Sequence, residues 1–242
     1  MLTWVEISKA DLLFNIGQLR RITGPKSQLM AVVKANAYGH GMEQLVPVIK
    51  TKVDWVGVAS LDEAFALRKN GIKKPVLVLS YYEDNMADLK VAVRKGVSFA
   101  VYDLSQIELL DDAAKSVGRR ARIHLKIDTG TSRLGIMPGE VNIFLKIIHG
   151  KRYVELEGIF SHFADSEEND GYTKKQLAIF KSVARRPEFA KTLHHIACSA
   201  AVLICRDSRL DLVRIGIALY GLYSSKRIHL PLKPALTWKT RI

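Results

Sequence analysis

The feature that most constrains the fold of this chain is a regular alternation of short apolar runs with amphipathic stretches. Eight apolar runs are typical of strands, near residues 29–34, 55–59, 76–80, 97–101, 121–127, 154–161, 193–198 and 211–215. Helical patterns lie between them, at 42–50, 61–70, 85–95, 105–116, 141–149, 173–185 and 200–205. The run Val76–Ser80 is apolar almost throughout, as expected of a parallel strand that is buried on both faces.

Eight such units in 242 residues predict an α/β fold, a closed (β/α)8 TIM barrel, rather than an open doubly wound sheet. No Gly-x-Gly-x-x-Gly follows a predicted strand, which argues against a dinucleotide site. A further strand, Thr3–Ile7, and a helix, Ala10–Ile22, are predicted before the barrel. Residues 230–242 alternate like a strand of another domain. No later segment follows for them to pair with, so we expect a chain that is cut short.

The net charge of +13 and the isoelectric point near 9.7 raise the question of nucleic-acid binding. Basic residues are spread over most of the predicted helices instead of gathering on one of them, which favours solvated helix faces. We therefore expect no nucleic-acid partner. A basic nucleic-acid-binding protein is kept as an alternative hypothesis, beside those introduced below. No run of about 18 apolar residues occurs, so no membrane segment is expected either.

Cysteine and histidine give little support to a disulfide framework or a metal site. Cys198 and Cys205 are too few for the first and are not spaced as a metal clamp. His194 and His195 are adjacent, so on a strand their rings point to opposite faces. The N-terminus has no apolar segment of the kind that directs secretion. We expect reduced thiols, a cytoplasmic location and no bound metal.

Polar residues follow five of the predicted strands, at the end of a barrel where chemistry and phosphate binding usually occur. The segments are Lys34 with Tyr38, Asp128–Gly135, Ser161-His162, Cys198-Ser199 and Arg214–Gly216. Lys34 ends an apolar run, where partial desolvation would leave a nucleophilic amine able to form a Schiff base.

Each of these residues also has a plain structural alternative. Lys34 could extend from a strand end to water, and His162 could be a hydrogen-bonded core histidine. Arg133 could pair with Asp128. Ser199 could cap the following helix, and Arg214 could form an ion pair at the rim.

Five motifs together resemble the barrel domain of the alanine racemase family. They are Ala31–Gly41 around Lys34, Asp-Thr-Gly-x-x-Arg-Leu-Gly at 128–135, Ser161–Ala164, Ser199–Ala201 and Arg-x-Gly-x-Ala-Leu-Tyr-Gly at 214–221. The resemblance runs from about Val5 to the last residues. It implies a pyridoxal 5'-phosphate-dependent isomerase that interconverts L-alanine and D-alanine and so supplies D-alanine for peptidoglycan.

The resemblance also assigns roles to individual residues. Lys34 would hold the cofactor as a Schiff base and act as one of two catalytic bases. Tyr38, Ser199 and the backbone N–H groups of Gly216 and Ile217 would bind the phosphate. Arg214 would face the pyridine nitrogen and, because a guanidinium accepts no proton, would keep that nitrogen unprotonated.

Two further residues complete the set that the resemblance implies. His162 would support the cofactor ring and Arg133 its phenolic oxygen. A lysine that matches Lys126 is carbamylated in many members of the family.

The chain also departs from the family. Racemisation needs a base on each face, and the family takes the second one from a tyrosine of a C-terminal β-domain, across a homodimer interface. We expect residues 1–228 to form the barrel and 229–242 to begin that β-domain, which is otherwise absent. Neither Tyr220 nor Tyr223 is a convincing substitute, so impaired racemisation is expected. Cys198 stands where the family usually has Asn, and the loss of that amide near the phosphate would loosen cofactor binding.

One alternative function remains open from the sequence. Single-domain barrels of the pyridoxal-phosphate homeostasis family also lack a β-domain, and the length of this chain fits such a non-catalytic carrier. The Lys34 motif, the strand Thr3–Ile7 and the alternating tail argue against it. Whether that tail is ordered would discriminate between the two.

Overall fold

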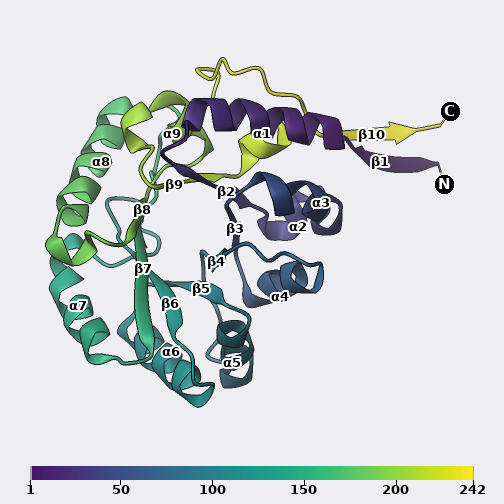
Figure 1. Cartoon of the computed structure of the whole chain (residues 1–242). Coiled ribbons are helices and arrows are strands. Elements are labelled where there is room, and N and C mark those ends of the chain that lie inside the picture. The colour runs from purple at the N-terminus through teal and green to yellow at the C-terminus, as the bar shows by residue number, and fades with distance from the viewer. Residues whose placement is uncertain (1, 242) are drawn as a thin grey trace.

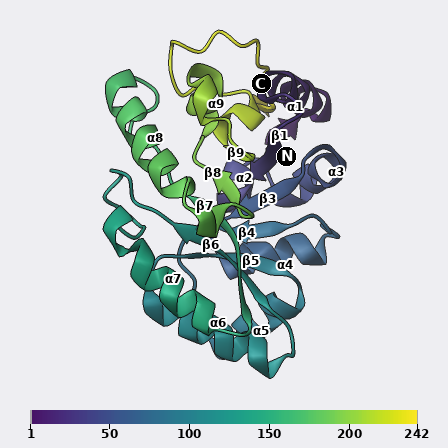
Figure 2. The same ribbon diagram turned by 60° about the vertical axis from the view of Figure 1, so that its left-hand side comes forward.

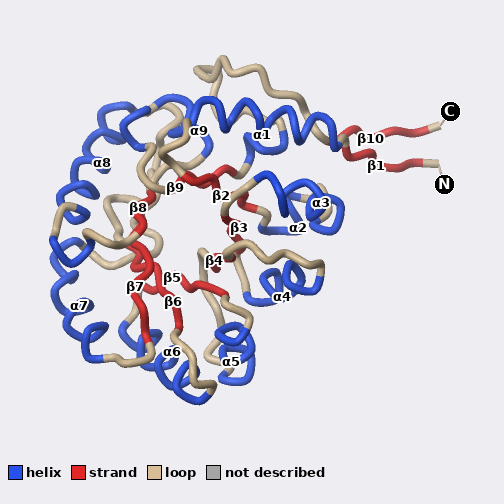
Figure 3. Tube along the Cα trace, viewed as in Figure 1, coloured by secondary structure: helices blue, strands red, loops and turns tan. Residues whose placement is uncertain are grey.

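Eight parallel strands surround the axis of the molecule, and helices cover their outer side (Figure 1). The structure is a computed structural model that describes residues 2–241. The strands are β2 (Gln28–Val32), β3 (Trp55–Val58), β4 (Val76–Val78), β5 (Val97–Val101), β6 (Ala121–Lys126), β7 (Val154–Phe160), β8 (Leu193–His195) and β9 (Leu212–Ile215). Figure 3 shows them as an inner ring.

The sheet runs in the order β8-β7-β6-β5-β4-β3-β2-β9, so its two edges meet between β8 and β9. Two backbone hydrogen bonds bridge these edges, from Asp211 N to His194 O and from Arg214 N to Ala197 O, each 3.1 Å long. The barrel is therefore nearly closed, and the predicted fold class is confirmed.

The outer layer is made of helices that follow the strands, as the view turned by 60° also shows (Figure 2). They are α2 (Lys34–Tyr38), α3 (Met42–Lys52), α4 (Leu61–Lys69), α5 (Met86–Arg94), α6 (Leu104–Ser116), α7 (Val141–Gly150), α8 (Asp170–Ala184) and α9 (Ser199–Ile204). The earlier helix α1 (Lys9–Thr23) packs against α3 and α9 and completes the ring. Within residues 2–241, none of the helices has the length and apolar character that a membrane span requires.

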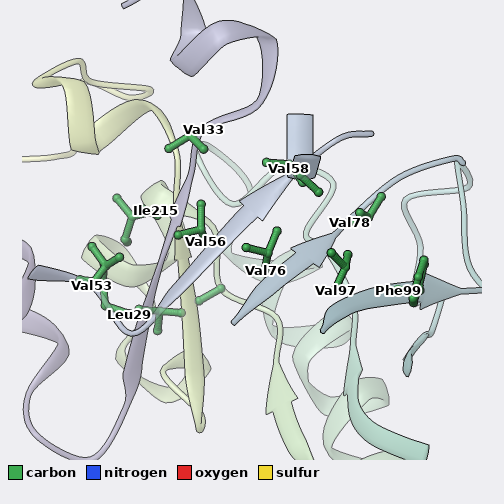
Figure 4. Close-up of a cluster of buried hydrophobic side chains, with 14 of the residues drawn as sticks. Leu29, Val33, Val53, Val56, Val58, Val76, Val78, Val97, Phe99 and Ile215 are labelled. Carbon is green, nitrogen blue, oxygen red and sulfur yellow. The ribbon is translucent and has the colours of Figure 1, made fainter. Parts of the chain in front are cut away.

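Side chains alternate along each strand, so one set packs under the helices and the other fills the barrel. The side chains that pack under the helices include valines of neighbouring strands, among them Val56, Val76 and Val97 (Figure 4). A smaller cluster includes Met30 of β2, Trp55 of β3 and Leu77 of β4, and the last two alternate with Val56 and Val76 on their strands. A closely packed core of this kind leaves the chemistry to the ends of the strands.

Three local predictions need correction. The strand before Lys34 ends at Val32, and Lys34 instead opens α2, which the sequence analysis did not predict. Helix α6 is capped by Asp103 with Gln106, so it starts one residue earlier than expected. The tail is not without a partner, because β10 (Leu236–Thr240) pairs antiparallel with β1 (Thr3–Ile7). This two-stranded ribbon extends away from the barrel (Figure 1).

The tail is held in place before it reaches the ribbon. Asn15 of α1 is fully buried, and its side chain bonds both the N–H and the carbonyl oxygen of Lys233 at 2.8 Å. Ser8 N then donates to Ala235 O at 2.8 Å. The tail is therefore ordered from Lys233 to the ribbon.

Candidate active site

A cavity of about 440 Å³ opens at the carboxyl ends of the barrel strands, and its lining contains every site residue proposed from the sequence. These residues are Lys34, Tyr38, Lys126, Arg133, His162, Cys198, Ser199, Arg214, Gly216 and Ile217. They come from the loops after β2, β6, β7, β8 and β9, or from the last residues of β6 and β9. The barrel thus brings together side chains that are up to 183 residues apart, between Lys34 and Ile217.

Lys34 sits at the start of an unusual backbone turn. The four residues after it, Ala35 to Tyr38, have φ angles of 52°, 51°, 57° and 53°, in the left-handed region. L-residues pay about 1–2 kcal/mol each for that conformation and normally adopt it singly. The turn points the chain sharply away from β2. Lys34 is exposed, so protein atoms alone do not give the partial desolvation that the sequence predicted.

Tyr38 lies against the backbone of Gly216, which is in the loop after β9. A Cβ atom at Gly216 would lie 2.6 Å from the Tyr38 hydroxyl oxygen, so only glycine leaves room for this contact. Burial raises the pKa of Tyr38. The ring of Tyr38 also packs on that of the buried Tyr220, with 5.2 Å between centroids.

Ser199 joins two loops of the cavity rather than capping a helix. Its hydroxyl oxygen accepts hydrogen bonds from Gly216 N at 3.0 Å and from Ala218 N at 3.4 Å. The N-cap residue of α9 is Cys198, whose side chain makes no capping hydrogen bond. The N–H of Gly216 is therefore already partnered, whereas Ile217 opens a 3-10 turn, where an amide has no acceptor within the helix.

Arg214 is the most constrained charge in the cavity. It is 5% exposed, and burial lowers its pKa to about 10. Its guanidinium donates to Ser161 O at 2.7 Å, Ile196 O at 3.0 Å and His162 Nδ1 at 3.1 Å. Arg214 thus forms no ion pair within residues 2–241, unlike the plain alternative for it.

A chain of hydrogen bonds leads from Arg214 down through the barrel interior. Arg214 Nη1 lies 2.8 Å from His195 Nδ1, His195 Nε2 lies 2.9 Å from His124 Nδ1, and His124 Nε2 lies 3.1 Å from Glu157 Oε2. A guanidinium only donates, so His195 Nδ1 must accept and its proton must be on Nε2. The same reasoning gives His124 its proton on Nε2. All bonds therefore run in one direction, from Arg214 to Glu157.

Burial keeps both histidines of this chain neutral, because it lowers the pKa of His124 and of His195. Burial raises the pKa of Glu157, but the hydrogen bonds from His124 and Ser98 and the charge of Arg122 outweigh it and hold that pKa below its usual range. The sequence analysis missed His124, His195 and Glu157. Their only signal was polar residues at interior-facing positions of predicted strands.

His162 and Lys126 line the cavity beside Arg214, and their proton affinity is strongly lowered. Burial, followed by the charges of Arg214 and Arg133, lowers the pKa of His162 to about 3. Burial and the same two arginines lower the pKa of Lys126 to about 8. Lys126 lies over the Phe160 ring, with its Nζ 5.5 Å from the centroid.

Arg133 does not pair with Asp128, as the plain alternative had it. The Asp128 carboxylate instead accepts from the backbone N–H groups of Gly130 at 2.7 Å and Thr131 at 2.8 Å. The loop is thereby folded on itself, and Arg133 is left exposed at the cavity rim. The cavity is lined by four basic side chains and one acidic side chain, Glu167, so it favours an anionic ligand. The basic side chains are those of Lys34, Lys126, Arg133 and Arg214.

One further lining residue was not found from the sequence. The Ser224 hydroxyl oxygen is buried and has no hydrogen-bond partner among residues 2–241. Buried polar atoms are usually satisfied, so this hydroxyl is available to a ligand. A lone serine in a loop carries no sequence signal that would have revealed it.

The opposite end of the barrel offers no comparable site. A shallow hollow of about 710 Å³ lies there, lined by Arg119, Arg120, Arg122 and Arg152. Three of these guanidinium groups bond backbone carbonyl oxygens nearby. Among residues 2–241 no group of three or more His, Cys, Asp or Glu side chains is placed to hold a metal ion.

The fold and the cavity define a (β/α)8 barrel with a cationic site at the carboxyl ends of its strands. The sequence model of the alanine racemase N-terminal domain matches residues 7–224. Alanine racemase 1 of Oceanobacillus iheyensis is 36% identical over 98% of this chain and 65% of its own length. Alanine racemase 2 of Caldanaerobacter subterraneus is 39% identical over 99% of this chain and 63% of its own length.

Solved structures agree with the sequence relatives. Alanine racemase of Clostridium difficile 630 in complex with cycloserine is 34% identical and superposes with a TM-score of 0.93, over 99% of this chain and 68% of that one. The enzyme of Bacillus anthracis with bound L-Ala-P is 32% identical, with a TM-score of 0.88, over 98% of this chain and 63% of that one. The chain belongs to the alanine racemase family and spans about two thirds of the length of these relatives.

Proposed function

We propose that this chain is the cofactor-binding barrel of an alanine racemase. It binds pyridoxal 5'-phosphate, acts on alanine and takes part in the interconversion of the L and D forms, which supplies D-alanine for peptidoglycan. The observation that carries the proposal is the convergence of Lys34, Arg133, His162 and Arg214 on one cavity in a chain of this family.

The cavity fits a ligand that carries a phosphate and an aldehyde. Its basic side chains, Lys34, Lys126 and Arg133, complement the phosphate and a substrate carboxylate. The unpartnered Ser224 hydroxyl lines the same cavity as Ser199 and as Tyr38, which approaches Gly216 closely. These features support a phosphate subsite made of Tyr38, Ser199, Gly216 and Ile217.

The remaining proposed roles are those that the family resemblance implies for these residues. Lys34 would hold the cofactor through its amine and serve as one catalytic base. Arg214 would face the pyridine nitrogen, His162 would support the ring and Arg133 the phenolic oxygen. Lys126, whose pKa is lowered to about 8, is partly neutral near neutral pH, which favours carbamylation by carbon dioxide.

When bound, pyridoxal phosphate stabilises negative charge at the α-carbon of the amino acid that it carries. Lys34 can remove or return the α-proton on one face only. The Arg214 guanidinium has no lone pair with which to accept a proton. It donates one of its hydrogen bonds to His195 Nδ1. Arg214 would therefore leave a pyridine nitrogen bound beside it unprotonated, which would limit how far charge spreads into the cofactor ring.

Neither Tyr220 nor Tyr223 is placed to act as the second base. Tyr220 is fully buried, burial raises its pKa, and its hydroxyl donates to Val32 O at 3.2 Å. Tyr223 bonds Leu230 O at 2.8 Å and does not line the cavity. We propose that the second base is a tyrosine of a C-terminal β-domain in a homodimer, with residues 1–228 as barrel and 229–242 as the start of that domain. The cytoplasmic location stays a prediction.

Borohydride reduction tests the binding role directly. Pyridoxal phosphate is added to the chain, the mixture is reduced, and labelled lysines are located by peptide mass spectrometry. We expect one dominant label at Lys34 and a visible absorbance band that Lys34→Ala abolishes. Lys126→Ala controls for cavity amines in general. Equal labelling of many surface lysines, unchanged by Lys34→Ala, would refute the binding role. Specific binding without any α-proton exchange would favour the carrier alternative.

A further inference from the structure

The left-handed turn after Lys34 begins with an amide that no residue of its own turn satisfies. Ala35 N–H donates instead to Glu63 Oε1, at 2.6 Å. Glu63 belongs to α4, in the next β/α unit of the barrel. The later part of the turn is closed locally, since Ala37 N bonds Val33 O at 2.8 Å and Gly39 N bonds Ala35 O at 3.0 Å. The contact from Glu63 therefore fixes the one end that is next to Lys34.

The second oxygen of Glu63 is also used. Glu63 Oε2 accepts from Ala59 N at 2.7 Å, at the start of the loop between β3 and α4. The backbone N–H of Glu63 donates to Ser60 Oγ at 3.4 Å, which seats the residue in the first turn of its helix. One carboxylate thus joins two neighbouring loops of the cavity rim, and Ala59 itself lines the cavity.

Backbone in the left-handed region persists only where the surroundings hold it there. Four consecutive non-glycine residues adopt it here, at φ angles of 51° to 57°. Bonds from N–H groups to a carboxylate are shorter and stronger than those between neutral groups. A single carboxylate on Ala35 N–H is well suited to keep this turn, and with it the direction in which the Lys34 side chain leaves the backbone.

We propose that Glu63 is a positioning residue for Lys34, acting through the backbone of Ala35. The inference rests on the proposed function in so far as Lys34 carries the cofactor. Glu63 does not line the cavity, so it contacts neither cofactor nor substrate. Its removal leaves Ala35 N–H without an acceptor and lets the turn relax toward ordinary backbone angles.

Two variants and one matched control test this role. Glu63→Ala removes both hydrogen bonds, whereas Glu63→Gln keeps one acceptor oxygen and should behave as an intermediate. Asp62→Asn removes the same charge from the same helix turn, and its side chain accepts no hydrogen bond among residues 2–241. Thermal unfolding confirms that each variant is folded.

Amide hydrogen exchange of residues 33–42 reports on the turn without any need for cofactor. We expect exchange there to rise about tenfold or more in Glu63→Ala, less in Glu63→Gln, and not at all in Asp62→Asn. The dissociation constant for pyridoxal phosphate should rise by about tenfold in Glu63→Ala, and the pH at which Lys34 captures it should shift.

The outcomes separate the two proposals. Unchanged exchange in Glu63→Ala would overturn the role of Glu63, whatever the cofactor does. Faster exchange with unchanged affinity and pH of capture would overturn it too, because the turn would then not direct Lys34. If the unaltered chain binds no pyridoxal phosphate, the proposed function fails, while the exchange measurement still decides whether Glu63 holds the turn.

Discussion

At the scale of single residues, the site depends on groups whose charge state the fold has set. His162 accepts a hydrogen bond from Arg214 and therefore has to be neutral at Nδ1. His195 and His124 are held in one tautomer by the same requirement, passed on along the chain of bonds to Glu157. A proton added at His162 Nδ1 or His195 Nδ1 would face the buried Arg214 guanidinium directly.

This arrangement predicts a loss of stability in acid. The pKa of His162 is lowered from 6.5 to about 3, so below about pH 6.5 the unfolded chain binds a proton that the folded chain does not. The free energy of unfolding should therefore fall as the pH decreases through that window. One such group contributes at most about 1.4 kcal/mol per pH unit.

Replacing His162 by Asn removes this proton but keeps an acceptor for Arg214. We expect His162→Asn to reduce the pH slope by up to about 1.4 kcal/mol per unit between roughly pH 6 and pH 4. Urea unfolding at a series of pH values measures it, with His229→Asn as a control at an exposed histidine. Identical slopes for the parent chain and both variants would show that His162 does not titrate in this way.

At the scale of elements, the strands were predictable because their apolar runs leave little choice of environment. All eight barrel strands were located from hydrophobic pattern and spacing, within a few residues of their ends. Helix α2 was missed because, in Lys-Ala-Asn-Ala-Tyr, only Asn36 is of a residue type that favours the left-handed region, and normally as a single residue. Its geometry is set by Glu63, which is 28 residues from Ala35 in sequence, and local propensity cannot report such a contact.

Strand β7 shows how one small residue shapes the interior. Its pairing with β6 shifts register between Ile123 and His124, and Gly158 lies opposite His124. A Cβ atom at Gly158 would overlap His124 Nδ1 and lie 2.9 Å from Leu193 O. The His124 ring is completely buried and bonded through both nitrogens, so it has no free direction in which to move.

We therefore expect Gly158→Ala to destabilise the fold by about 1–3 kcal/mol, as overpacking of a core does. Gly17→Ala is the matched control, because an added Cβ there meets nothing within 4 Å and the site is inside helix α1. That variant should be stabilised by about 0.5–1 kcal/mol. Denaturant unfolding compares them, and equal stability of the two variants would show that the interior yields to the extra methyl group.

At the scale of the whole molecule, the sequence placed all the proposed site residues at one end of one barrel, and the structure brings them to one cavity. That success has a physical reason, since in a parallel barrel the carboxyl ends of all strands share a rim. The sequence did not reveal the residues outside the recognised motifs that contribute to the site. They are Glu63, Ser224 and the interior chain of hydrogen bonds from His195 to Glu157. These contacts depend on which interior positions face one another across the closed sheet.

The ribbon of β1 and β10 is a second lesson at this scale. Both strands could be recognised from their alternation, but their mutual pairing could not, because Thr3 and Thr240 are distant in sequence. The ribbon exposes the apolar side chains of Val5 and Trp238, at 53% and 76%, beside the ion pair of Glu6 and Lys239, while Ile7 packs against the barrel core.

The most direct test of the central claim is exchange of the α-proton of alanine in heavy water, with pyridoxal phosphate added and Lys34→Ala as the control. If Lys34 is the base on one face of the site, this chain by itself should exchange one enantiomer in a Lys34-dependent manner without inverting it. Exchange of both enantiomers with racemisation would show that a residue of the barrel supplies the second base. No exchange above the Lys34→Ala control, with the cofactor bound, would contradict a catalytic role for this site.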